Sequence, residues 1–204
     1  MRVVVITGGI GAGKSTAAEF FRAHGAVVVD ADSVAAHVLE KGSPVLGRVA
    51  EEFGPDVLLA DGSLDRPALA RDAFASREAA ARLNAIVHPA VAREIGPAIA
   101  DLRLLPDPPA VVVIEVPLLA EAPVFAELAD DVIAIVAPQD KRVARAVASG
   151  LAEPDVRRRL AVQASDAQRA ELADVVIVND ADKERFLGEL RRVWEERLAV
   201  GARL

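Results

Sequence analysis

The stretch Gly8–Thr16, which reads GGIGAGKST, brings four glycines, one lysine and two hydroxyl side chains together near the N-terminus. It fits the pattern G-x-x-x-x-G-K-[ST], in which the backbone N–H groups of a loop surround a phosphate. In that chemistry Lys14 reaches the β- and γ-phosphates of a nucleotide, and the Ser15 hydroxyl binds Mg²⁺. The other positions expected to bind the ATP phosphates are Gly9, Gly11, Ala12, Gly13 and Thr16.

The alternative for this stretch is a glycine-rich turn without a ligand. A chance match to the pattern in a chain of this length has a probability under about 1%. The context also favours a phosphate site, because an apolar run precedes the loop and a helix-forming segment follows it. Neither D-x-x-G nor N-K-x-D, which a GTPase would need, occurs in the chain. The sequence therefore predicts an ATP site.

Two aspartates, Asp30 and Asp32, follow the next apolar run, Val27–Val29. Ligands of parallel sheets bind beyond the carboxyl ends of the strands, so these carboxylates are expected beside the glycine loop. Asp32 there could orient an acceptor hydroxyl or take its proton during phosphoryl transfer. Alternatively, Asp32 only caps the following helix. Asp30 is expected to be structural or to act through water.

Three further polar residues are candidates, each with a structural alternative. Glu115 ends an apolar run and could hold a magnesium-bound water, or its carboxylate could be satisfied by local backbone. His88 precedes Pro89, which is expected to begin a helix, and could contact an anionic substrate or serve as a cap. Asn179 follows the last apolar run and could lie near the nucleotide base or form a turn.

Arginines cluster after the fourth apolar run. Arg142 and Arg145 are one helical turn apart, so they share a helix face. We expect this face to close over the transferring phosphates as part of a lid, with Arg142 offsetting charge and Arg145 binding ATP. The alternative is a solvated charged face, which we expect for most of Arg157–Arg159.

The composition limits the possible partners. A net charge of −7 and 3% aromatic residues argue against a nucleic-acid-binding protein.

Cysteine is absent, so thiol chemistry and disulfides are excluded, which fits a reducing cytosol. The N-terminus lacks the features of a signal peptide, and no apolar stretch approaches the roughly 18 residues of a membrane span. A cytoplasmic location is expected.

The apolar runs alternate with helix-forming segments, which predicts an α/β fold with a parallel five-stranded sheet of the P-loop NTPase type. Strands are expected at 3–6, 27–29, 111–114, 132–136 and 175–178. Helices are expected at 14–24, 33–41, 44–53, 66–75, 77–86, 90–105, 138–148, 154–164 and 182–198. Asp65 is expected to be the N-cap of the helix at 66–75, because Arg66-Pro67 follows it. This organisation predicts a single kinase domain 1–204, with a core (1–32, 110–138 and 166–204), an inserted helical substrate region (33–109) and a lid (139–165).

Several motifs occur in one order along nearly the whole chain, and with them the chain resembles the dephospho-coenzyme A kinases. These motifs are TGGIGAGKST (7–16), VVDADSVA (28–35), GSLDRPAL (62–69), LNAIVHP (83–89), VPLLAE (116–121), QDKRVAR (139–145), RRRLAVQAS (157–165) and ADVVIVND (173–180). Relatives often have Asp at position 115, Phe at 120 and Gly at 181, where this chain has Glu115, Ala120 and Ala181.

The resemblance implies that ATP, with Mg²⁺, phosphorylates the ribose 3′-hydroxyl of dephospho-coenzyme A, the last step of coenzyme A synthesis. It also implies that Asp32 acts at the acceptor hydroxyl, while Arg66, His88 and Glu121 contact the substrate. The expected partner is this small molecule, with no nucleic acid and no membrane, and the protein is expected to be a monomer or small homo-oligomer. The rival hypotheses are a P-loop kinase of nucleosides or nucleotides and an ATP-dependent switch with a protein partner.

Overall fold

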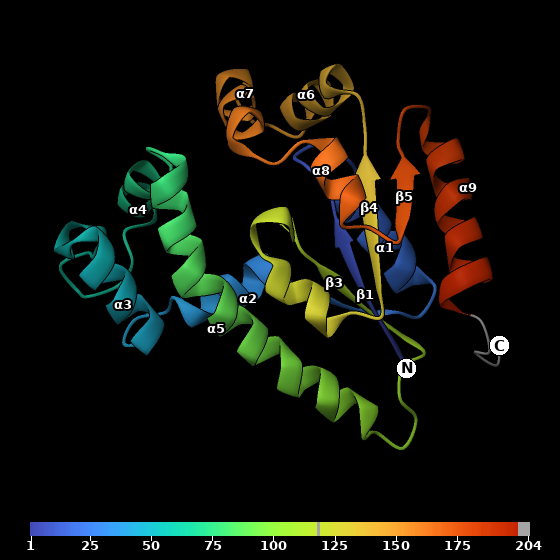
Figure 1. Cartoon of the computed structure of the whole chain (residues 1–204), viewed down its shortest axis with the longest axis horizontal. Coiled ribbons are helices and arrows are strands. Elements are labelled where there is room, and N and C mark those ends of the chain that lie inside the picture. Colours follow the sequence, from blue (N-terminus) through green and yellow to red (C-terminus); the bar gives the residue numbers. More distant parts are fainter. Residues whose placement is uncertain (118, 200–204) are drawn as a thin grey trace. The chain divides into compact units, whose positions relative to one another are not determined.

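The computed structural model describes residues 1–117 and 119–199. The chain divides into two compact units, one formed by Met1–Asp30 with the chain from Ile99 onward, the other by Ala31–Ala98. The first unit contains the predicted parallel sheet, with strand order β2-β3-β1-β4-β5 (Figure 1). Its strands are β1 (Arg2–Thr7), β2 (Val27–Asp30), β3 (Val111–Glu115), β4 (Asp131–Val136) and β5 (Val175–Val178).

Continuous apolar runs form the central strands. The residues of 3–6 in β1 and of 111–114 in β3 are all fully buried, as expected where both faces of a parallel sheet are covered. At the edge of the sheet, Val176 and Val178 of β5 are 41% and 53% exposed. Because all strands run in the same direction, their carboxyl ends meet at one edge, where the glycine loop leaves β1.

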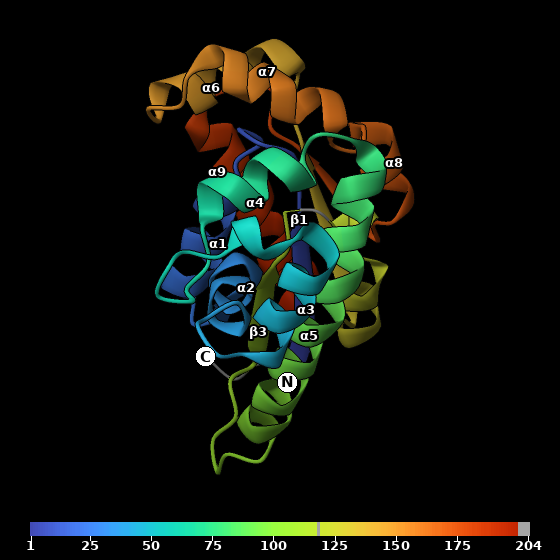
Figure 2. The same ribbon diagram turned by 90° about the vertical axis from the view of Figure 1, so that its left-hand side faces the viewer.

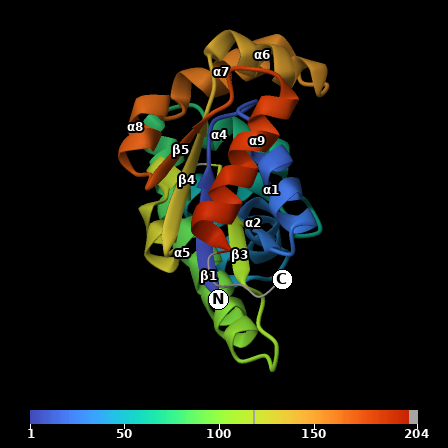
Figure 3. The same ribbon diagram turned by 90° about the vertical axis from the view of Figure 1, so that its right-hand side faces the viewer.

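Helices cover this sheet on both faces. On one face α1 (Lys14–Ala23) and α9 (Lys183–Val193) lie side by side, as Figure 3 shows. Phe21, Phe186 and the ring of Trp194 join the β1 side chains there in one buried cluster. On the other face α8 (Asp166–Glu171) contacts β4. The helices α6 (Gln139–Ala148) and α7 (Glu153–Val162) lie beyond the carboxyl ends of the strands (Figures 1 and 2).

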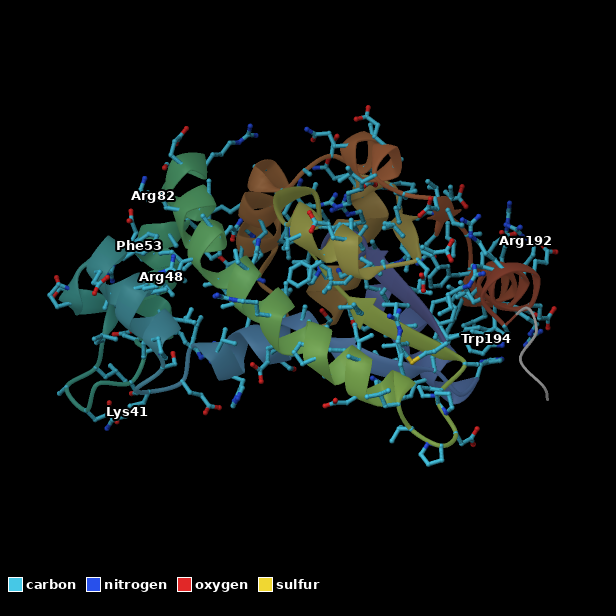
Figure 4. The ribbon with its side chains drawn as sticks, turned by 60° about the horizontal axis from the view of Figure 1, so that its bottom comes forward. Lys41, Arg48, Phe53, Arg82, Arg192 and Trp194 are labelled. Atoms are coloured by element: carbon cyan, nitrogen blue, oxygen red, sulfur yellow. The ribbon has the colours of Figure 1, made fainter. Side chains whose placement is uncertain are left out.

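The second unit is helical, as predicted. It contains α2 (Ala31–Val38), α3 (Pro44–Phe53), a 3₁₀ turn (Pro55–Val57), α4 (Arg66–Ala73) and most of α5 (Arg77–Arg103). The predicted cap of α4 is confirmed, because the Asp65 carboxylate accepts from the backbone N–H of Ala68 at 3.0 Å. Figure 4 shows Arg82 beside Phe53, and its guanidinium lies 5.9 Å from the centre of that ring.

The prediction of two helices at 77–86 and 90–105 is wrong, because α5 continues through Pro89 and Pro97. Each proline removes one backbone hydrogen bond and costs roughly 3 kcal/mol inside a helix. An apolar stripe runs past both prolines with helical spacing, and its residues Val87, Val91, Ile95 and Ile99 are buried. Packing of this stripe outweighs the cost of the prolines. His88 consequently lies within α5, and Pro89 does not begin a helix.

Two aspartates at the amino end of β4 bind groups of β1 and of the C-terminal helical segment. Asp131 is 3% exposed and accepts from Arg2 NH1 at 2.8 Å and from Arg197 Nε at 2.6 Å. The carboxylate of Asp130 accepts from the backbone N–H of Val3 at 2.8 Å. Asp131 therefore joins the first strand of the chain to its C-terminal helical segment through two half-exposed arginines.

We predict that Asp131→Asn lowers the free energy of unfolding by about 2 kcal/mol, because a buried carboxylate that satisfies two cations is lost. Chemical denaturation measures the change. The control is Glu189→Gln, which breaks the exposed pair with Arg192 and is expected to cost less than about 0.5 kcal/mol. Equal effects of the two substitutions would contradict the structural role of Asp131.

Candidate active site

The glycine loop, residues 8–13, connects β1 to α1. Gly13 precedes the first helical residue with a left-handed φ of 112°, and it has no side chain that could cap the helix. A helix N-terminus without a side-chain cap can receive an anion, as in known phosphate sites. The Lys14 ammonium donates to the carbonyl oxygens of Gly8 at 2.9 Å and Gly9 at 3.4 Å. These contacts keep the lysine against the loop that it is predicted to serve.

Arg142 packs against the loop from α6. Its Nε donates to the carbonyl oxygen of Ile10 at 3.0 Å, and its side chain is buried. A Cβ at Gly9 would overlap the Arg142 guanidinium, and a Cβ at Gly11 would overlap its backbone carbonyl. Gly11 is thus required by the backbone of a residue more than a hundred positions later in the chain, and Gly9 leaves room for the guanidinium of the same residue.

Asn179, directly after β5, also forms a hydrogen bond with the glycine loop. Its Nδ2 donates to the carbonyl oxygen of Ala12 at 2.8 Å, and a Cβ at Gly13 would press on the same nitrogen. Arg145 donates to the side-chain oxygen of Asn179 at 3.1 Å and to its backbone oxygen at 3.2 Å. The structure brings Arg145 and Asn179 together at the loop, and their contacts with ATP stay predictions.

Sequence reasoning missed three residues next to the loop. Gln163, after α7, accepts from the backbone N–H of Ile10 at 3.3 Å. Asp166 accepts from Arg142 at 2.9 Å, and the fully buried Arg169 donates to the same carboxylate. The spacing Ser165-x-x-Gln168 is that of a capping box and predicts a helix that begins at Asp166. It was the available sequence signal for the structure of this segment. Burial of Arg169 had no comparable signal in the sequence.

Two carboxylates end strands beside β1. Glu115 is in register with Ile6 of β1 and with Asp30 of β2, so both acids lie at the edge from which the loop leaves. Ser15 lies in the first turn of α1 and is exposed. A hydroxyl and one or two carboxylates fit Mg²⁺, which keeps several waters and takes further ligands from phosphates. Among the described residues, no group of three or more His or acidic side chains could hold a metal alone.

The predicted substrate residues belong mainly to the second unit. Asp32 is exposed in the first turn of α2, immediately after β2. Arg66 is the first residue of α4 and is exposed, whereas His88 is half-buried within α5. The Glu121 side chain lies outside the described residues. The roles of these four residues toward a substrate stay predictions.

Comparison with known proteins decides between the P-loop classes. The family model for dephospho-CoA kinase matches residues 2–184. The chain belongs to the dephospho-CoA kinase family. It is 42% identical over 197 residues to the dephospho-CoA kinase of Thermobifida fusca, with 96% of each chain covered. The dephospho-CoA kinase of Corynebacterium diphtheriae is 42% identical over 196 residues, again with 96% of each chain covered.

Solved structures agree with this fold. A protein from Thermus thermophilus aligns with a TM-score of 0.77 and 33% identity, over 96% of this chain and 97% of that one. The dephospho-CoA kinase from Campylobacter jejuni shares the fold with a TM-score of 0.68 and 24% identity, over 97% and 98% of the chains. A shikimate kinase from Acinetobacter baumannii has the same P-loop kinase fold at a TM-score of 0.51 and 13% identity, over 100% and 96%.

We predict that Gly11→Ala weakens ATP binding at least tenfold and lowers the free energy of unfolding by roughly 2 kcal/mol. The φ of 71° at Gly11 is unfavourable for alanine, and the new Cβ would displace α6 from the loop. Calorimetric titration with ATP and thermal unfolding measure the two effects.

The control is Gly188→Ala within α9, where a Cβ meets no atom within 4 Å. It is expected to stabilise the protein by about 0.5–1 kcal/mol and to leave ATP binding unchanged. Normal ATP affinity in Gly11→Ala would contradict the tight contact between the loop and α6.

Proposed function

We propose that this protein transfers the γ-phosphoryl group of ATP to the ribose 3′-hydroxyl of dephospho-CoA, giving CoA and ADP. The observation that carries the proposal is the glycine loop, in which Lys14 lies against the loop carbonyls and Arg142 packs from α6. Membership of the dephospho-CoA kinase family supports the choice of acceptor.

In this proposal the ATP phosphates lie on the backbone N–H groups of Gly9, Gly11, Ala12, Gly13, Lys14, Ser15 and Thr16. Lys14 exchanges the carbonyl oxygens of Gly8 and Gly9 for phosphate oxygens and offsets the charge of the transferring group. Arg142 adds a second positive charge from α6, while Arg145 and Asn179 support the nucleotide at the end of β5. Fixed cations around a buried phosphoryl group stabilise the charge that develops there.

Ser15 and Glu115 would hold Mg²⁺. When bound, the metal neutralises phosphate charge and orients the γ-phosphoryl group. Asp32 orients the acceptor hydroxyl and accepts its proton, and Arg66, His88 and Glu121 bind dephospho-CoA. The protein forms no covalent intermediate of its own, so positioning and electrostatics supply the rate.

We further infer a cytoplasmic protein that acts as a monomer or small homo-oligomer, without a nucleic-acid or membrane partner. The absence of cysteine and the acidic composition support this inference. In residues 1–117 and 119–199, no helix is both long and apolar enough to cross a membrane.

The activity is tested by incubating the protein with ATP and Mg²⁺ plus dephospho-CoA, adenosine or AMP, or no acceptor. We expect rapid ADP release only with dephospho-CoA, and CoA as the product by mass spectrometry. Equal turnover with adenosine or AMP would favour a nucleoside or nucleotide kinase. Slow ATP loss that is independent of acceptor would favour an ATP-dependent switch.

We predict that Lys14→Ala lowers kcat/KM by roughly 100- to 1000-fold, because one preorganised positive charge at the phosphates is removed. The fold should survive, and circular dichroism should remain unchanged. Lys183→Ala, which removes an exposed lysine at the start of α9, serves as the control and should retain full activity. Loss of folding in Lys14→Ala would contradict a role confined to the site.

We predict that Asp32→Asn lowers kcat about 100-fold or more, while the Kd for ATP changes less than about threefold. The amide keeps the shape of the side chain but cannot accept the proton of the acceptor hydroxyl. Asp61→Asn, in an exposed turn of the same unit, is the matched control. A collapse of ATP affinity in Asp32→Asn would instead assign this carboxylate to the metal site.

A further inference from the structure

Two buried arginines share one carboxylate next to the glycine loop. Arg142 NH1 donates to Asp166 Oδ1 at 2.9 Å, and Arg169 NH1 donates to the same oxygen at 3.2 Å. Arg142 is 6% exposed and Arg169 is fully buried, whereas the Asp166 side chain is 29% exposed. Two cations and one anion leave one positive charge uncompensated in this triad, Arg142–Asp166–Arg169.

The excess charge lies mainly with Arg169. Its Nε and NH2 atoms are buried and have no acceptor among the described residues. A buried guanidinium without full compensation is costly, and an apolar side chain of similar volume would often be more stable at such a place. This cost indicates an electrostatic role for Arg169 beyond filling space under α8.

Arg142 connects the triad to the loop. Its Nε donates to the Ile10 carbonyl oxygen at 3.0 Å, while its NH1 is bound by Asp166. Burial lowers the pKa of Arg142, the charge of Asp166 opposes that shift, and the charge of Arg169 adds to it. Arg142 therefore responds to both partners, and an anion on the loop would compete with Asp166 for the same guanidinium.

We propose that Asp166 and Arg169 are positioning residues that set the affinity of the loop for nucleotide phosphates through Arg142. Asp166 first binds Arg142 and keeps it against the loop. When the phosphates replace Asp166 as the partner of Arg142, Asp166 pairs with Arg169 alone. Arg169 favours this exchange because it repels Arg142 and retains Asp166. The proposal rests on the proposed function only in taking ATP as the ligand.

The triad predicts affinity changes of opposite sign. Arg169→Met removes the excess charge and strengthens the hold of Asp166 on Arg142, so ATP should bind about tenfold more weakly. Asp166→Asn keeps the side-chain shape but removes the competing anion, so ATP should bind several-fold more tightly. Arg192→Met, which removes an arginine from an exposed ion pair of α9, is the control and should leave the Kd unchanged.

Calorimetric titration with ATP and Mg²⁺, without an acceptor, measures these affinities, and the KM for ATP should move in the same directions. Opposite shifts in the two variants support the proposal. Weaker binding in both, which a purely structural triad would produce, overturns it, as does an unchanged Kd in Arg169→Met.

Asp166→Asn decides alone if Arg169→Met does not fold, since weaker or unchanged ATP binding in that variant contradicts the proposal. The proposed function can also fail separately. Opposite affinity shifts in a protein that does not phosphorylate dephospho-CoA would leave this inference intact and reject the acceptor.

Discussion

The glycine loop depends on side chains from distant parts of the chain. Arg142 and Gln163 bind the carbonyl and N–H groups of Ile10, and Asn179 binds the carbonyl of Ala12. A glycine-rich segment loses much conformational entropy when it is ordered, so its own sequence does little to fix one shape. The conformation of the loop therefore depends on the packing of α6, α7 and β5 around β1.

The parallel sheet allows this arrangement because the two ends of its strands meet at opposite edges, which carry different side chains. At the amino ends of the strands, Asp130 and Asp131 bind backbone N–H groups and arginines. At the carboxyl ends, Lys14, Arg142 and Arg145 surround the loop. An acidic chain with a net charge of −7 thus carries a local cluster of cations around the loop, where we propose that phosphates bind.

The sequence predicted the features that depend on local pattern. The loop, the five strands and the Asp65 cap follow from residue spacing, and all are present in the structure. The break before Pro89 was wrong because tertiary packing of an apolar stripe outweighs a local helix-breaking preference. Arg169 was missed for a related reason: an arginine in a polar segment is expected in solvent, and only the folded chain shows that it is buried.

The contacts of Arg142 also change the physical reason for two glycines in the loop. From the sequence, all four glycines are explained by the close approach of a phosphate. In the structure, Gly9 and Gly11 leave room for the side chain and the backbone of Arg142. The absence of a Cβ at Gly9 and at Gly11 therefore allows α6 to pack closely against the loop. These two glycines thus have a packing role toward α6 in addition to the role toward phosphates that we propose for the loop.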